Sequence, residues 1–200
     1  FLFYFENIPA GQLIAYWPLD GNTKDASGHG YDGALQGGKW DPGIAGESLH
    51  FTGRGQYFEV SENLNAFANP SFTVAMWIRI DYWSDNWNCA ISFGGEDKGW
   101  ACKRREATSE WRFIHRGAPE EDWGTNGPAV SFGQWSHLAV TWDDTQKKLT
   151  WYKDGDLFSM RQMPSHSICY DTQWPILIGA TSEGGPHQFL AGLNGSVWVD

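Results

Sequence analysis

The sequence predicts an all-β protein, a two-sheet antiparallel jelly roll sandwich, and three observations support this fold class. Short strand patterns recur about every eight to twelve residues, each bounded by Gly, Pro, Asn or Asp. Aromatic residues, which fit pleated sheets, make up 16% of the chain, and 24 glycines supply turns. No segment holds a helical period of about 3.6 residues. Antiparallel strands in this number must close into a barrel or pack as two sheets.

Alternation of apolar and polar residues marks two strands most clearly. In the segment 71–80, one face carries Phe72, Val74, Met76, Ile78 and Ile80. In the segment 134–142, Leu138, Val140 and Trp142 share the apolar face with Ser136, and the opposite face carries Trp135, His137, Ala139 and Thr141.

The other expected elements follow from weaker signals. The pair Asp154-Gly155 predicts a two-residue hairpin turn, and the segment 63–68 predicts one short helical turn. Besides the two strands above, the predicted strands are 13–17, 48–51, 56–60, 89–93, 99–105, 110–116, 149–153, 156–160, 175–178 and 195–199.

Length and charge limit the function classes. We expect one jelly roll domain over 13–200, with 1–12 as an N-terminal edge strand or a linker remnant. The 24 acidic against 14 basic residues give a net charge of −10, which argues against a duplex nucleic-acid partner. No apolar run reaches the roughly 18 residues of a membrane span. Cys89 and Cys102 either form a disulfide, leaving Cys169 over, or all three are buried thiols.

Seven motifs in order carry a resemblance to a known family. They are LIAYWPLDGN, KDASGHGYDGAL, SLHFTGRGQYFEV, SFTVAMWIRI, QWSHLAVTWDD, LTWYKDG and LNGSVWVD. This order is similar to the laminin-G-like, concanavalin A-like jelly roll family in its pentraxin-like branch. The resemblance implies a non-catalytic extracellular or cell-surface module of a larger protein, whose partners are glycans or proteins and often include one calcium ion at the rim.

The segment DASGHGYDG is where that resemblance implies calcium. Asp25 matches the family's acidic position, and His29 sits where relatives often supply a main-chain carbonyl. Gln56 occupies a position that is frequently Asp, and Asp200 or Trp198 falls near a C-terminal ligand. Asp20 and Asp32 are alternatives in the same loop system. The competing interpretation is an Asx turn without a metal.

Loop tryptophans and a cluster of basic residues are the candidate glycan-binding residues. Trp83, Trp87 and Trp123 lie among polar residues, where they either stack on sugars or fold back over the sandwich edge; the strand residues Trp77, Trp142 and Trp151 are expected in the core. Six of the 14 basic residues fall between 98 and 116. Alternation places Lys103 and Arg105 on one face of their strand, and Arg112 and Arg116 on one face of the next. The two adjacent strands would then form one basic patch suited to carboxylate or sulfate groups of a ligand. A solvated face paired with acidic neighbours is the alternative.

Catalytic signatures are missing. The paired-carboxylate strand motif E-x-D-x-x-E of the related glycoside hydrolases is absent, as are nucleophile and zinc motifs. The expected function is therefore a carbohydrate-binding module for glycan, with an anionic polysaccharide favoured. The alternatives are a protein-protein adhesion module and, third, a polysaccharide lyase or hydrolase.

Overall fold

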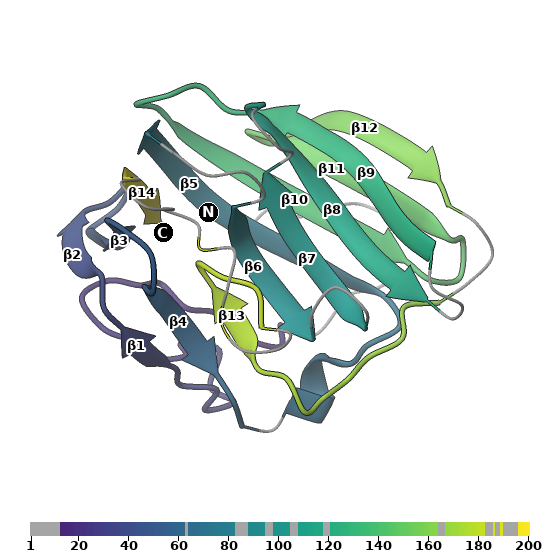
Figure 1. Cartoon of the computed structure of the whole chain (residues 1–200), viewed down its shortest axis with the longest axis horizontal. Helices are drawn as coiled ribbons and strands as arrows, with labels where there is room; N and C mark the ends of the chain where they lie inside the picture. Colours follow the sequence, from purple (N-terminus) through teal and green to yellow (C-terminus); the bar gives the residue numbers. More distant parts are fainter. Residues whose placement is uncertain are drawn as a thin grey trace.

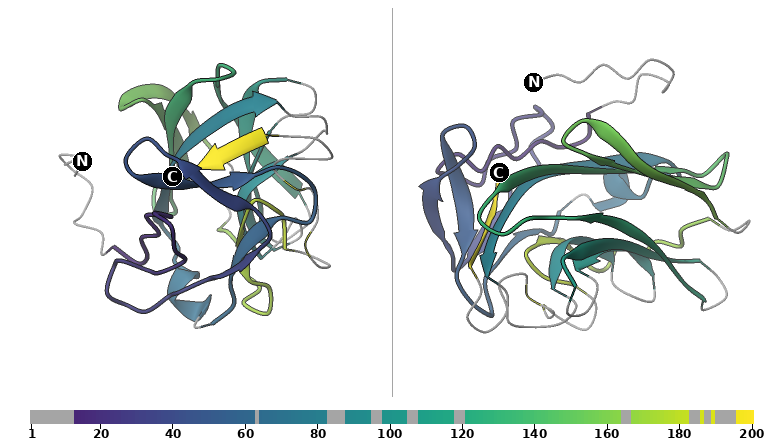
Figure 2. Two further views of the ribbon diagram at one scale, coloured as in Figure 1. Left: turned by 90° about the vertical axis from the view of Figure 1, so that its left-hand side faces the viewer. Right: turned by 90° about the horizontal axis from the view of Figure 1, so that it is seen from above.

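Two antiparallel sheets of seven strands stack face to face (Figures 1 and 2). The computed structural model describes residues 13–62, 64–82, 88–94, 98–104, 108–117, 121–163, 167–182, 186, 189 and 196–200, with the backbone alone at 116–117, 121–124, 196 and 198. The predicted jelly roll sandwich is confirmed. Residues 1–12, expected as an edge strand or linker, lie outside the described residues.

Sheet A and sheet B are each built from strands distant in sequence. In spatial order, sheet A contains β1 (Ala34–Gln36), β4 (Tyr57–Val60), β13 (Ile176–Ile178), β6 (Cys89–Gly94), β7 (Gly99–Arg104), β8 (Glu110–Gly117) and β9 (Glu121–Ala129). Sheet B contains β12 (Asp156–Gln162), β11 (Lys148–Lys153), β10 (Trp135–Asp143), β5 (Phe72–Tyr82), β14 (Ser196–Val199), β3 (Glu47–Phe51) and β2 (Lys39–Pro42). A 3-10 helical turn, η1 (Leu64–Phe67), confirms the predicted helical turn.

The core fills the space between the sheets. The alternation predicted for β5 and β10 holds, because Ile78, Ile80, Leu138 and Val140 are buried. Large aromatic side chains complete this layer, and the fully buried ones include Trp111, Trp142, Trp151, Phe51, Phe58 and Phe93. The expectation of a core position is thus confirmed for Trp142 and Trp151.

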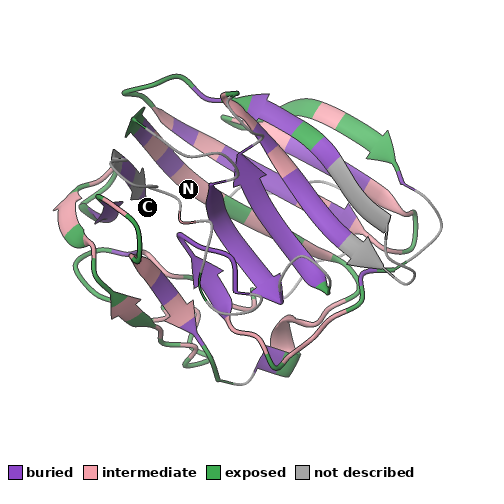
Figure 3. Ribbon diagram, viewed as in Figure 1, coloured by how far each residue is buried: buried purple, intermediate pink, exposed green. Residues whose placement is uncertain are grey.

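Strands β6 and β7 are buried on both faces (Figure 3). The segment after β13 crosses the outer side of β6, where the Ser92 hydroxyl donates to the Ala180 carbonyl at 3.1 Å. The Ser182 hydroxyl donates to the Gly94 carbonyl at 3.3 Å. The outer face of sheet A is therefore covered at its centre, which leaves sheet B as the sheet with an open face.

The segment 13–17 is not a strand, contrary to the sequence prediction. Its backbone groups pair instead with the loop that follows. The Asp25 carboxylate accepts from Tyr16 N at 3.0 Å, Ala26 N donates to the Tyr16 carbonyl, and the Ser27 hydroxyl donates to the Ile14 carbonyl. These partners replace a neighbouring strand.

Strand β9 was not predicted, because its sequence EDWGTNGPA reads as a loop. One of its two glycines, Gly127, has a packing role. A Cβ on Gly127 would lie 2.6 Å from Trp151 Cε2, so the buried indole of the opposite sheet needs that position to be glycine. The Trp151 indole also donates to Thr125 Oγ1 of β9 at 3.2 Å. Strands β1 and β2 are short and were missed as well.

Turn and cysteine predictions have clear outcomes. Asp154 and Gly155, with φ of 53° and 92°, form the predicted hairpin turn between β11 and β12.

Cys89 and Cys102 are buried thiols, and Cys169 is an exposed thiol. The disulfide alternative therefore does not hold, and one of the three thiols is not buried. Within the described parts of the chain, no helix has the length and apolar character needed to cross a bilayer.

Candidate functional site

Strands β5 and β10 of sheet B pack one face against the core. Their other face is open and carries aromatic side chains. On β5 and β10, Trp77 and His137 are direct cross-strand neighbours and both are half-buried. Their rings pack edge to face, with 5.2 Å between the ring centroids and an interplanar angle of 62°. Trp77 was expected in the core; it points the other way because Met76 and Ile78 take the inward positions on either side.

A second cross-strand pair continues this face toward the rim. Trp135 lies opposite Arg79, and the Arg79 guanidinium makes two 2.9 Å hydrogen bonds to the carboxylate of Asp81. The turn before β10 is held against β5 by Gly133 N donating to the Ile80 carbonyl. Two strongly exposed aromatic side chains flank this rim, Tyr82 at 54% and Phe132 at 56% exposure.

In the other direction the face becomes flat and polar. Ala75 and Ala139 are cross-strand neighbours, so no large side chain rises there. Beyond them the hydroxyls of Thr73 and Thr141 lie 3.0 Å apart. We name the surface formed by Thr73, Ala75, Trp77, Arg79, Asp81, Trp135, His137, Ala139 and Thr141 the β5–β10 face.

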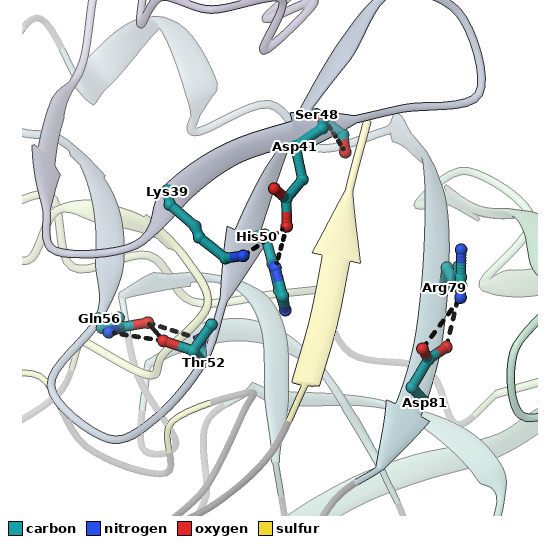
Figure 4. Close-up of polar contacts among 8 residues, drawn as sticks. All are labelled: Lys39, Asp41, Ser48, His50, Thr52, Gln56, Arg79 and Asp81. Atoms are coloured by element: carbon teal, nitrogen blue, oxygen red, sulfur yellow. Dashed lines mark hydrogen bonds and ion pairs between the residues drawn. The ribbon is translucent and has the colours of Figure 1, made fainter.

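A charged cluster lies on the same side of sheet B, across β14 (Figure 4). Asp41 of β2 accepts from His50 Nδ1 of β3 at 2.5 Å and pairs with Lys39 Nζ at 2.9 Å. Hydrogen bonds from Lys39 and His50 lower the Asp41 pKa. Burial lowers the pKa of His50, and burial also lowers the pKa of His137 on the β5–β10 face. Both imidazoles are therefore neutral at pH 7.

The carboxylate of Asp25, the predicted calcium ligand, accepts four hydrogen bonds from its own loop. One carboxylate oxygen accepts from Tyr16 N and Ser27 N, and the other accepts from the Ser27 hydroxyl and Tyr31 N, at 2.7–3.0 Å. Burial alone would raise its pKa, but these hydrogen bonds outweigh burial and lower the pKa to about 2. These four hydrogen bonds engage the carboxylate in an Asx turn, the alternative interpretation of this loop.

The other predicted calcium residues are dispersed. His29 lines an open hollow of about 280 Å³ beside Tyr31, and the Gln56 amide oxygen accepts from Thr52 N at 2.6 Å (Figure 4). Asp200 accepts from Ile44 N at 2.7 Å, and burial raises its pKa, with Asp20 adding to the effect. Across the described residues, no three His, Cys, Asp or Glu side chains come together to hold a metal ion. Calcium binding stays a prediction.

The predicted basic patch is only partly assembled. Lys103 and Arg112 are cross-strand neighbours on β7 and β8, as expected from their adjacent strands. The prediction of an exposed patch is wrong for Lys103, which is 1% exposed because the outer face of sheet A is covered. Arg105 lies outside the described residues, as do Trp83 and Trp87, and the side chains of Arg116 and Trp123 are also outside them.

The sequence did hold a signal for the β5–β10 face. The alternation that buries Leu138 and Val140 necessarily turns Trp135 and His137 outward, and the same rule turns Trp77 outward on β5. Aromatic residues at polar-face positions of two neighbouring strands indicate a binding surface rather than a core.

Comparison with solved structures shows the same fold in bacterial toxin domains. The receptor-binding domain of the botulinum neurotoxin C/D mosaic serotype superposes with a TM-score of 0.67 at 16% identity, covering 88% of this chain and 43% of that chain. The binding domain of botulinum neurotoxin DC in complex with rat synaptotagmin II has a TM-score of 0.65 at 16% identity, covering 88% and 43%. The receptor-binding domain of botulinum neurotoxin D has the same TM-score and identity, covering 88% and 44%.

These matches cover less than half the length of the toxin domains, and at this identity they show the fold alone. No curated protein sequence matches the chain. The Laminin_G_3 family profile, described as the concanavalin A-like lectin/glucanases superfamily, matches residues 52–199. That span is most of the chain and includes both strands of the β5–β10 face, so the chain belongs to the concanavalin A-like lectin/glucanase superfamily.

Proposed function

We propose that this chain is a non-catalytic carbohydrate-binding module and that the β5–β10 face holds the glycan. The observation that carries the proposal is the edge-to-face pair of Trp77 and His137 on the open side of sheet B. An aromatic ring with a polar handle at a half-exposed position suits a ligand that has both apolar faces and hydroxyls. A sugar ring has this chemistry.

Fixed polar groups surround the rings. The doubly hydrogen-bonded pair of Arg79 and Asp81 offers donors and an acceptor in a set orientation. A binding site needs few polar groups if they are held rigidly. The β-sheet backbone and the bidentate pair supply that rigidity here.

The structurally similar toxin domains support the ligand class. One was solved in complex with SialylT, and cell entry of the type C toxin depends on two ganglioside molecules. For this chain we propose glycan recognition outside the cell or at its surface, as one module of a larger protein.

A non-catalytic role agrees with the state of Asp41 and Asp81, two carboxylates on this side of the sheet. Glycosidases use a pair of carboxyl groups as acid and nucleophile or base. Asp41 is held by Lys39 and His50, and Asp81 is held by Arg79, so each already has a cationic or imidazole partner.

A protein ligand is the second candidate, and a different surface favours it. The edge strand β12 exposes Leu157 at 60%, Phe158 at 52% and Met160 at 61%. Apolar side chains on an unpaired sheet edge are typical of contacts with another chain.

Alanine substitution separates the two candidates. Trp77→Ala should lower the affinity for a glycan found on an array at least tenfold, which corresponds to about 1.4 kcal/mol. Phe158→Ala is the matched control, since it removes an exposed ring from β12 and should leave the affinity unchanged. Thermal unfolding of both variants checks the fold. Full glycan affinity in folded Trp77→Ala would contradict the proposal, and reducing ends released from the bound glycan would contradict the non-catalytic role.

A further inference from the structure

We infer that the glycan held by the β5–β10 face is neutral, so that uronic-acid, sialylated and sulfated chains are not its ligands. This inference rests on the proposed function and narrows it. It also reverses the sequence expectation of an anionic polysaccharide.

Two cations on the open side of sheet B, Arg79 and Lys39, already have carboxylate partners. Arg79 holds Asp81 through two 2.9 Å hydrogen bonds, and the two side chains are equally exposed at 34%. Lys39 Nζ lies 2.9 Å from Asp41. An incoming carboxylate or sulfate would have to displace an internal carboxylate that is already well oriented.

The imidazoles do not add positive charge at neutral pH. The open side of sheet B carries His50 and His137, and burial is the main cause that lowers the pKa of each. His50 faces both Asp41 and Lys39, while Asp154 accepts from the backbone N–H of His137. Neutral imidazoles provide no positive charge with which a carboxylate or sulfate could pair.

The rest of the molecule repels polyanions. The net charge is −10, so an anionic chain meets a repulsive field at long range. Two residues of the basic cluster between 98 and 116 lie on sheet A, where Lys103 is buried and Arg104 is 3% exposed. These residues cannot reach a ligand on the open face of sheet B, because the core lies between the sheets.

Hydroxyl chemistry completes the face. Thr73 and Thr141 present two hydroxyls 3.0 Å apart next to the flat floor made by Ala75 and Ala139. The arrangement of rings, hydroxyls and a compensated ion pair matches the groups that a neutral sugar exposes.

The test is a glycan array followed by titration calorimetry, with neutral probes (β-glucan, xylan and galactomannan oligosaccharides) and anionic probes (alginate, heparin and sialylated oligosaccharides). We expect wild-type binding among the neutral probes only, lost in Trp77→Ala. The affinity should change less than about twofold between 20 mM and 500 mM NaCl, because screening acts on charged contacts.

Asp81→Asn adds a gain-of-function arm. The variant removes the Asp81 carboxylate from Arg79 at almost unchanged size, so it should acquire salt-sensitive alginate binding that the wild type lacks. Trp77-dependent wild-type binding confined to anionic probes would overturn this inference and leave the proposed function standing. Binding that ignores Trp77, or no binding to any probe, would overturn the proposed function itself.

Discussion

Among single residues, Asp25 stabilises the loop of residues 14–31 through its charge. Its carboxylate accepts four hydrogen bonds, three of them from backbone N–H groups, which join Tyr16, Ser27 and Tyr31. Asp25→Asn replaces one acceptor oxygen by an NH₂ group that faces donors. We expect a loss of about 2 kcal/mol in the free energy of unfolding at pH 7, from a pKa lowered from 3.8 to about 2.

The lowered pKa of Asp25 also predicts how its contribution to the free energy of unfolding changes with pH. A lowered carboxyl pKa means that the unfolded chain binds the proton more readily, so the stabilisation is full above pH 4 and disappears as the pH falls toward 2. Urea unfolding of wild type and Asp25→Asn across this range should therefore converge at low pH. Asp156→Asn, an exposed position on β12, is the control. A constant difference between the two proteins at every pH would show that the carboxylate charge is not the cause.

Among the elements, the packing of β9 against the opposite sheet requires glycine at position 127. Gly127→Ala would place a Cβ 2.6 Å from the Trp151 indole, and such overpacking costs about 1–3 kcal/mol. Asn126→Ala, an exposed neighbour on the same strand, should change stability by less than about 0.5 kcal/mol. Thermal and denaturant unfolding measure both. If the clash is the cause, the added substitution Trp151→Phe should recover part of the loss, and a fully additive double variant would refute it.

The contrast between β9 and β5 shows what could be predicted from the sequence. Strands β5 and β10 were predicted because each packs one face against the core. Apolar and polar residues therefore alternate along them. Strand β9 was missed because the Trp151 indole of the opposite sheet fills the space beside Gly127. The strand therefore has no apolar side chain at this inward position, and the alternating pattern is lost. Lys103 was misplaced because alternation gives the face of a residue but not what covers that face. The outward Trp77 and His137 were predictable from the same period, yet their pairing needed the strand order.

For the whole molecule, calcium remains a prediction that the rim at Asp200 can test. Burial and the nearby Asp20 raise the Asp200 pKa, so a dication there would offset two carboxylates, with carbonyl oxygens completing its shell. Calcium added to chelated protein should raise the melting temperature of the wild type and of Asp25→Asn, but not of Asp200→Asn, because a ligand that binds only the native state stabilises it. A wild-type melting temperature that does not respond to calcium or chelator would remove the site.

The strand order also governs when the molecule can fold during its synthesis. β13 lies between β4 and β6, and β14 lies between β3 and β5, so both sheets keep a central vacancy until residues 176–199 have left the ribosome. Until then the nascent chain carries four unsatisfied strand edges together with the apolar residues between the sheets. Such intermediates are prone to aggregate. We therefore expect production of this protein to be sensitive to premature termination and to chaperone supply, because both sheets can close only after β14 has been made.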